Sequence, residues 1–238
     1  MTNPLAASTA QTVAAEWTIS CDERWLVVSL RTSHVTASWA LVGGGVRHAE
    51  TIAWHRVDEC ELQPPIDARS LLLQRLSQRG MARAVGLMTG CRLNGYRDVR
   101  RGDGEVNARC IATVGLSNAL RIGDPAGPAG RIGTINLMCG VSVPLTRNGL
   151  LETLSLAAEA RTAAMLQSGV ASRRTGLAAT GTGTDCIVVA APEGRPLHDY
   201  AGKHTRVGHA VGAAVEEAVR QGALNWLAEQ DKLREASS

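Results

Sequence analysis

The 238-residue chain contains no phenylalanine and only two tyrosines, so five tryptophans carry most of its aromatic content. Aliphatic residues and alanine must therefore form most of the core. A chain of this length buries enough apolar surface to fold without a disulfide or a structural metal.

Its six cysteines never occur as a C-x-x-C pair, which argues against a zinc ribbon or a thioredoxin-like redox centre. We expect most of them to be buried thiols in a reducing compartment, with a disulfide as the less favoured alternative. The N-terminus lacks a basic segment followed by an apolar one. No apolar run reaches the roughly 18 residues of a membrane span. We therefore expect a cytoplasmic protein that does not contact a membrane.

The chain also lacks a large excess of either charge, because its 25 Lys and Arg residues nearly balance its 22 Asp and Glu residues. The formal net charge is +3. The basic clusters, at 97–101 and 173–174, are too short to follow a phosphate backbone. We expect no nucleic-acid partner.

Apolar alternation, helical spacing and glycine or proline breaks predict one α+β domain over residues 17–232. It should contain a mixed or mostly antiparallel sheet and about three main helices, between flexible segments at 1–16 and 233–238. The predicted strands are 25–30, 34–40, 51–57, 84–88, 107–116, 133–143 and 186–191, and the predicted helices are 67–80, 150–167 and 204–232.

The segment Thr180–Asp185 is the most informative, because glycines alternate with threonines directly before the apolar run Cys186–Ala191. Glycine lets the backbone approach a ligand closely, and the hydroxyl and N–H groups then face that ligand. This pattern is typical of an active-site loop. The competing interpretation is a turn in which Asp185 binds local backbone amides. No Lys-Ser or Lys-Thr follows, so a phosphate-binding P-loop is disfavoured.

The helix predicted at 150–167 carries Glu152, Ser155, Glu159 and Thr162 at spacings of three and four, so they share one face. Such a face could serve a site. Glu159 could equally be a solvated residue paired with Thr162 or Arg161.

Five blocks in order resemble the adenosylcobinamide amidohydrolase (CbiZ) family over about residues 28–219. The blocks are Asn118 with Gly123-Asp124, Gly133–Asn136, Glu159–Ala164, Gly181–Asp185 and Tyr200–Thr205. The resemblance implies hydrolysis of the amide that joins the aminopropanol arm to the corrin ring of adenosylcobinamide. The product would be adenosylcobyric acid, used in corrinoid salvage and cobalamin biosynthesis, and some members also act on pseudocobalamin-type corrinoids. Two departures are Arg161, where the family usually has lysine, and Trp39, where it favours small residues.

On this basis the candidate catalytic residues are Asp185, Glu159 and His204. Asp185 or Glu159 would be the general base toward water, and His204 would protonate the leaving amine. The candidate substrate-binding residues are Asn118, Asn136, Arg161, Gly181, Thr182, Gly183, Thr184 and Lys203. Backbone N–H groups of 181–184, with either asparagine, would hold the oxyanion.

Alternatives remain open at this point. A covalent route would use Thr182, Thr184 or Cys186 as nucleophile, although a packed, inert Cys186 is favoured. A corrinoid carrier or sensor without catalysis would need the same binding surface. We expect neither cofactor nor protein-bound metal, since no two histidines have the spacing of zinc ligands on a helix and cobalt belongs to the substrate. Trp25, Trp39 and Trp54 could form a wall for the corrin ring, but core packing is favoured. A homo-oligomer is left open.

Overall fold

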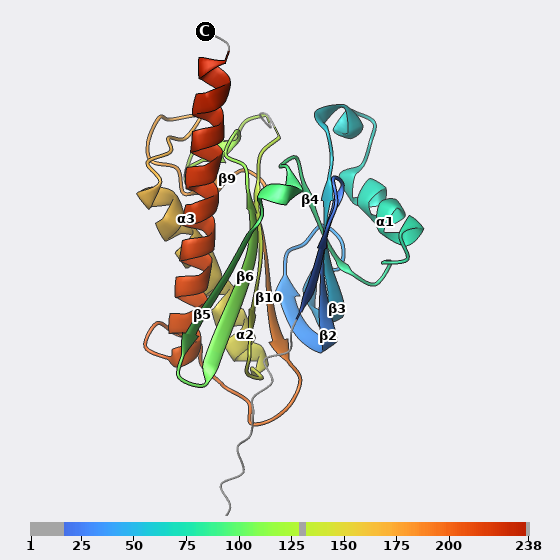
Figure 1. Ribbon diagram of the computed structural model, residues 1–238, viewed down its shortest axis with the longest axis vertical. Coiled ribbons are helices and arrows are strands. Elements are labelled where there is room, and N and C mark those ends of the chain that lie inside the picture. The colour runs from blue at the N-terminus through green and yellow to red at the C-terminus, as the bar shows by residue number, and fades with distance from the viewer. Residues whose placement is uncertain (1–16, 129–131, 237–238) are drawn as a thin grey trace, which may run out of the picture.

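The computed structural model describes residues 17–128 and 132–236, so the predicted flexible segment 1–16 lies outside the described residues. Figure 1 shows the arrangement of its strands and helices. The elements are β1 (Thr18–Cys21), β2 (Trp25–Ser38), β3 (Gly45–Arg56), the 3₁₀ helix η1 (Glu59–Leu62), α1 (Ala68–Gln78), β4 (Val85–Thr89), the 3₁₀ helix η2 (Leu93–Gly95), β5 (Arg97–Asp103), β6 (Val106–Val114), β7 (Ala119–Leu120), β8 (Ile135–Val141), α2 (Arg147–Gln167), β9 (Gly181–Thr182), β10 (Cys186–Pro192) and α3 (Arg206–Glu235).

The main sheet has the strand order β4-β3-β2-β10-β8-β6-β5, with β1 paired to β2. The pairs β10–β8 and β3–β4 are parallel, whereas the other pairs are antiparallel. A second, two-stranded sheet joins β7 to β9. The prediction of an α+β domain with a mixed sheet and three main helices is confirmed.

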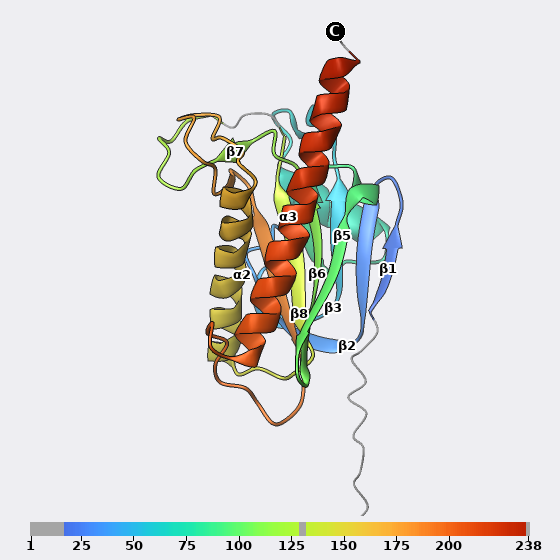
Figure 2. The same ribbon diagram turned by 60° about the vertical axis from the view of Figure 1, so that its left-hand side comes forward.

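The central strands β8 and β10 are buried on both faces. Ile187 and Val189 face α2 and α3, which lie side by side over the β5–β10 half of the sheet (Figure 2). Val188 and Ala190 face the opposite core. This explains why β10 has a continuous apolar sequence rather than an alternating one.

The opposite core exists because the sheet curls, so that β3 and β4 pack against β8 and β6. Trp54 of β3 packs in one cluster with Met138 of β8 and Ile111 of β6. Its indole N–H also donates to the carbonyl of Asn136 at 3.5 Å. The outer face of this half is covered by α1, through Leu72 and Leu76 (Figure 1). The curl brings the end of β4 to the start of β8.

Several boundaries differ from the sequence predictions. β2 is one strand rather than the two predicted, because its pairing with β3 resumes after an irregularity between Ser29 and His34. β5 was missed, since its exposed arginines look like a basic cluster although Val99 is buried among them. α3 runs to Glu235, so the predicted flexible tail begins within a helix. None of the helices in the described residues is long and apolar enough to cross a membrane.

Candidate active site

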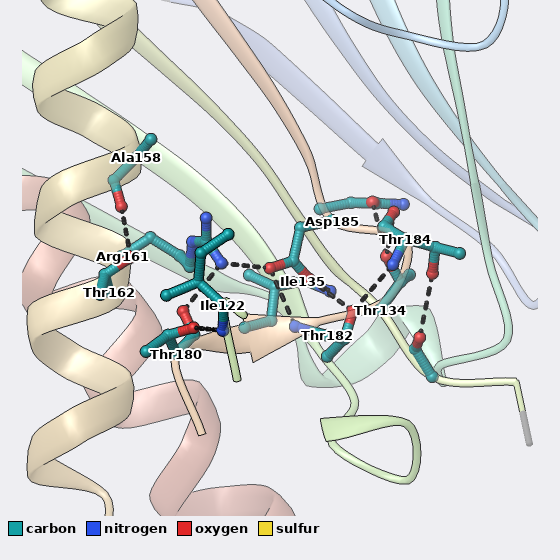
Figure 3. A network of polar contacts seen from close by, with 12 residues as sticks. Ile122, Thr134, Ile135, Ala158, Arg161, Thr162, Thr180, Thr182, Thr184 and Asp185 are labelled. Carbon is teal, nitrogen blue, oxygen red and sulfur yellow. Dashed lines mark hydrogen bonds and ion pairs between the residues drawn. The ribbon is translucent and has the colours of Figure 1, made fainter. Parts of the chain in front are cut away.

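The glycine-threonine segment folds beside the start of the parallel pair β8 and β10. Gly181 and Thr182 form β9, which pairs with Ala119 and Leu120 of β7. The backbone N–H and the hydroxyl of Thr182 both donate to the Asp185 carboxylate, directly before β10 (Figure 3). The segment is therefore held by its own aspartate.

The Asp185 carboxylate has a donor at every acceptor position. Oδ1 accepts the backbone N–H of Ile135 at 3.0 Å and the hydroxyl of Thr182. Oδ2 accepts Nη1 of Arg161 at 2.5 Å and the backbone N–H of Thr182 at 3.0 Å. The side chain is only 6% exposed. Burial raises the pKa of Asp185, and the Arg161 charge and the hydrogen bonds from Thr182 and Ile135 oppose that rise. Asp185 thus ties together α2, β8 and β9 (Figure 3).

Helix periodicity separates Arg161 from Glu159. Two positions along an α-helix correspond to a rotation of about 200°. Arg161 faces the sheet, where it also donates to the carbonyl of Thr180 at 2.9 Å. Glu159 points outward and forms an ion pair with Lys203, with both side chains more than half exposed. At Glu159, the polar face predicted for this helix is therefore exposed to solvent.

A cavity of about 900 Å³ opens at the start of β8 and β10, next to the end of β4. Four of the predicted site residues line it: Asn118, Asn136, Thr184 and Asp185. The others do not: Arg161, Gly181, Thr182 and Gly183 lie behind the wall in contact with Asp185 or Asn118, and Glu159, Lys203 and His204 are on the surface. The expected convergence of Asp185, Glu159 and His204 on one cavity is therefore not what the structure shows.

The polar end of the cavity is built from amides and hydroxyls. Asn136 is almost fully buried, donates to the carbonyl of Met88 at 2.7 Å and accepts the Thr134 hydroxyl at 3.1 Å. Thr184 donates to the carbonyl of Gly133 at 3.2 Å. The Asn136 amide is thus already hydrogen-bonded to β4, and this bond joins the two halves of the curled sheet. Asn118 is only partly buried and lines the cavity, so its side-chain amide is better placed to meet a ligand.

Two further residues of the cavity wall differ from the sequence predictions: core packing was favoured for Trp39, and Glu59 was not singled out. Trp39 is 48% exposed, and its indole N–H donates to the backbone carbonyl of Asp185 at 2.7 Å, whereas Trp25 and Trp54 are core residues as expected. Glu59 lines the same cavity from η1, directly after β3. The signal that could have found Glu59 is the acidic run that follows the predicted strand at 51–57.

The alternative nucleophile Cys186 is buried, and this burial raises the pKa of its thiol to about 12. A reactive thiolate is therefore disfavoured at neutral pH. All six cysteines are free thiols, and three of them are buried. Among the described residues, no group of three His, Cys, Asp or Glu side chains is arranged to hold a metal ion.

Comparison with known proteins adds to this geometry. A family model described as adenosylcobinamide amidohydrolase matches residues 8–231. The chain belongs to the adenosylcobinamide amidohydrolase family. This confirms the resemblance carried by the five sequence blocks.

The chain is also similar to two curated proteins and to one solved structure. An adenosylcobinamide amidohydrolase of Halobacterium salinarum is 33% identical over 168 residues, 66% of this chain and 67% of that protein. An uncharacterised protein of Methanocaldococcus jannaschii is 29% identical over 168 residues, 62% of this chain and 64% of that protein. The matches thus span about two thirds of each relative. The PH0078 protein of Pyrococcus horikoshii OT3 has a TM-score of 0.42 at 13% identity, covering 87% of this chain and 78% of that one.

Proposed function

We propose that this protein is an amidohydrolase that cleaves the aminopropanol amide of adenosylcobinamide and releases adenosylcobyric acid for corrinoid salvage. The observation that carries the proposal is the cavity of about 900 Å³, in which an apolar wall meets an amide and hydroxyl cluster at the strand ends. Membership of the adenosylcobinamide amidohydrolase family supports the choice of substrate. The volume lies in the upper part of the range for small-molecule sites.

The cavity wall combines the two kinds of surface that a corrinoid requires. Its apolar side chains, among them Trp39, Leu41, Leu62 and Leu87, offer a surface for the flat ring. The exposed indole of Trp39 is suited to stacking on such a ring. The Asn118 amide, which lines the same cavity, would donate to the carbonyl oxygen that becomes the oxyanion.

Asp185 has a positioning role in this proposal. Because it joins Ile135, Arg161 and Thr182, it fixes the segment that carries Thr184 into the cavity. A general-base role for Asp185 or Glu159, and an acid role for His204, stay predictions. The same holds for substrate contacts by Lys203.

Acceptance of larger, pseudocobalamin-type corrinoids, which carry a phosphate beyond the aminopropanol arm, stays a prediction. A second cavity of about 500 Å³, lined by Arg47 and Arg69, adjoins the first at Trp39, the residue proposed to stack on the ring. The phosphate lies on the other side of the scissile amide from the ring, so these two guanidinium groups are not assigned to it. Incubation of the protein with pseudocobalamin, followed by mass spectrometry of the corrinoid, tests this acceptance.

A corrinoid carrier or sensor is the second candidate function. It is favoured by one observation, namely that the Asp185 carboxylate is saturated with donors while Glu159 and His204 lie outside the cavity. Incubation with adenosylcobinamide, followed by mass spectrometry of the corrinoid, separates the two functions. A product with a new carboxylate supports the amidohydrolase, and binding without conversion supports the carrier.

The remaining parts of the proposal concern the setting of the reaction. Cobalt would enter with the substrate, and no resident cofactor is proposed. A cytoplasmic location, the lack of a nucleic-acid partner and the number of subunits are further points for experiment.

A further inference from the structure

The cavity wall contains few groups that could accept a proton from water. Of the described residues that line it, Glu59, Asp185 and Cys186 are the titratable ones. Cys186 is excluded as a base at neutral pH, because its thiol has a pKa raised to about 12 by burial. The choice is therefore between two carboxylates.

Asp185 has no lone pair left for a water molecule. A carboxylate offers about four acceptor positions. Four donors already occupy them, from Ile135, Arg161 and both the N–H and the hydroxyl of Thr182. Accepting a proton from water would require one of these bonds to break inside a wall that leaves the side chain 6% exposed.

Glu59 is in the opposite situation. It is exposed, and within the described part of the chain its carboxylate accepts one hydrogen bond, from the backbone N–H of Ile132 to Oε1 at 3.1 Å. That bond ties the carboxylate to the segment that continues through Gly133 to Thr134, which also lines the cavity. Because the Glu59 side chain is exposed, its second carboxylate oxygen is left for water as far as the described residues are concerned. The η1 helix that carries Glu59 is fixed by a capping box between Asp58 and Glu61.

We propose that Glu59 is a catalytic residue of the proposed amide hydrolysis and acts as the proton shuttle for the attacking water, an inference that rests on the proposed function. As the water oxygen bonds to the amide carbon, Glu59 takes one proton from the water. The C–N bond then breaks, and the same proton passes from Glu59 to the nitrogen, which leaves as aminopropanol. The corrinoid keeps the water oxygen as a carboxylic acid, which releases its proton to solvent. Glu59 returns to the carboxylate form, so one residue serves as base and then as acid.

The test compares the full-length wild type with Glu59→Gln, Glu59→Asp and Glu61→Gln. Glu61 lies on the same 3₁₀ helix but its carboxylate binds Arg24 outside the cavity, so Glu61→Gln is the matched control for a disturbed helix. Each variant is assayed for kcat and KM with adenosylcobinamide and for corrinoid binding by absorbance titration. The pH profile of kcat/KM is recorded for the wild type and for Glu59→Gln.

We expect Glu59→Gln to lower kcat by about 10² to 10⁴ while corrinoid binding is largely retained. Glu59→Asp should give an intermediate rate, and Glu61→Gln should stay close to wild type. The acid limb of the wild-type profile should disappear in Glu59→Gln.

Three outcomes would overturn the inference. Turnover by Glu59→Gln within tenfold of an active wild type would remove Glu59 from the chemistry and leave the proposed function standing. Equal losses of binding and turnover in Glu59→Gln and Glu61→Gln would show that η1 matters only for the shape of the cavity. A wild type that binds adenosylcobinamide without converting it would overturn the proposed function, and this inference with it.

Discussion

Two ion pairs that begin on the same helix have opposite environments. Arg161 and Glu159 of α2 are two residues apart, yet the Arg161–Asp185 pair is buried, at 16% and 6% side-chain exposure, and the Glu159–Lys203 pair is 58% and 71% exposed. The buried pair closes the back of the cavity wall, whereas the exposed pair is a solvent contact between α2 and the segment before α3. Two residues from the same family-like sequence block can therefore lie on opposite sides of a helix, one buried behind the cavity and one in solvent.

The largest difference between the pairs should appear in stability. Arg161→Met leaves the Asp185 carboxylate buried without its counter-charge, so we expect a loss of about 3–5 kcal/mol in the free energy of unfolding. Urea denaturation measures this loss. The double variant Arg161→Met/Asp185→Leu should be less destabilised than the sum of the two single variants, since no buried charge is left unpaired. A loss below about 1 kcal/mol for Arg161→Met would mean that the two pairs are equivalent.

Two buried histidines extend the comparison to groups that hydrogen-bond a backbone carbonyl: Nδ1 of His34 lies 2.8 Å from the carbonyl oxygen of Thr32, and Nδ1 of His55 lies 3.2 Å from that of Arg24. Burial lowers the pKa of His34 and of His55 from the ordinary value of 6.5. The unfolded chain therefore binds protons at a higher pH than the folded chain. The stability from their neutral forms is complete above about pH 6.5 and is lost as the pH falls toward the folded pKa values.

Each histidine contributes at most about 1.4 kcal/mol per pH unit to this slope. Urea unfolding between about pH 5 and pH 7.5 measures it. His34→Gln should show a smaller slope than the wild type, with His209→Gln, at an exposed position on α3, as the control. Identical slopes in all three proteins would contradict the effect of burial.

The exposed pair should have a small effect. Glu159→Gln or Lys203→Met should change the free energy of unfolding by no more than about 1 kcal/mol, because solvent screens both charges. The double-mutant coupling energy should vanish in 1 M salt, at which the Debye length is about 3 Å. A coupling that persists in high salt would show that this pair is buried in the functional protein.

Metal removal should have the smallest effect. The carboxylates of both ion pairs bind protein donors. Among the residues described by the structure, no three His, Cys, Asp or Glu side chains are arranged to hold a metal ion. Dialysis against a chelator should leave the hydrolysis rate and the thermal midpoint unchanged. Loss of activity that added zinc restores would identify a metal site.

Much of the fold was predictable, because the local signals agreed with the tertiary structure. The helix predicted at 67–80 is α1, with Asp67 as its N-cap, and the apolar run after Asp185 forms β10 as expected. Of the residues predicted for the site, Asn118, Asn136, Thr184 and Asp185 line one cavity, and their roles stay predictions. Sequence reasoning failed where a side chain's direction depends on its helical phase or on a distant strand.

Local sequence signals predicted all three main helices and most strands of the main sheet, because glycine, proline and apolar periodicity act over a few residues. The sequence also determined the family, because five blocks occur in a fixed order. Long-range packing, in contrast, sets which carboxylates line the cavity, namely Glu59 and Asp185. The curl of the sheet brings Glu59, after β3, to the same cavity as Thr134 and Asp185, at the starts of β8 and β10. The physical reason is that this meeting depends on long-range packing around Trp54 and Met138, which no local pattern encodes.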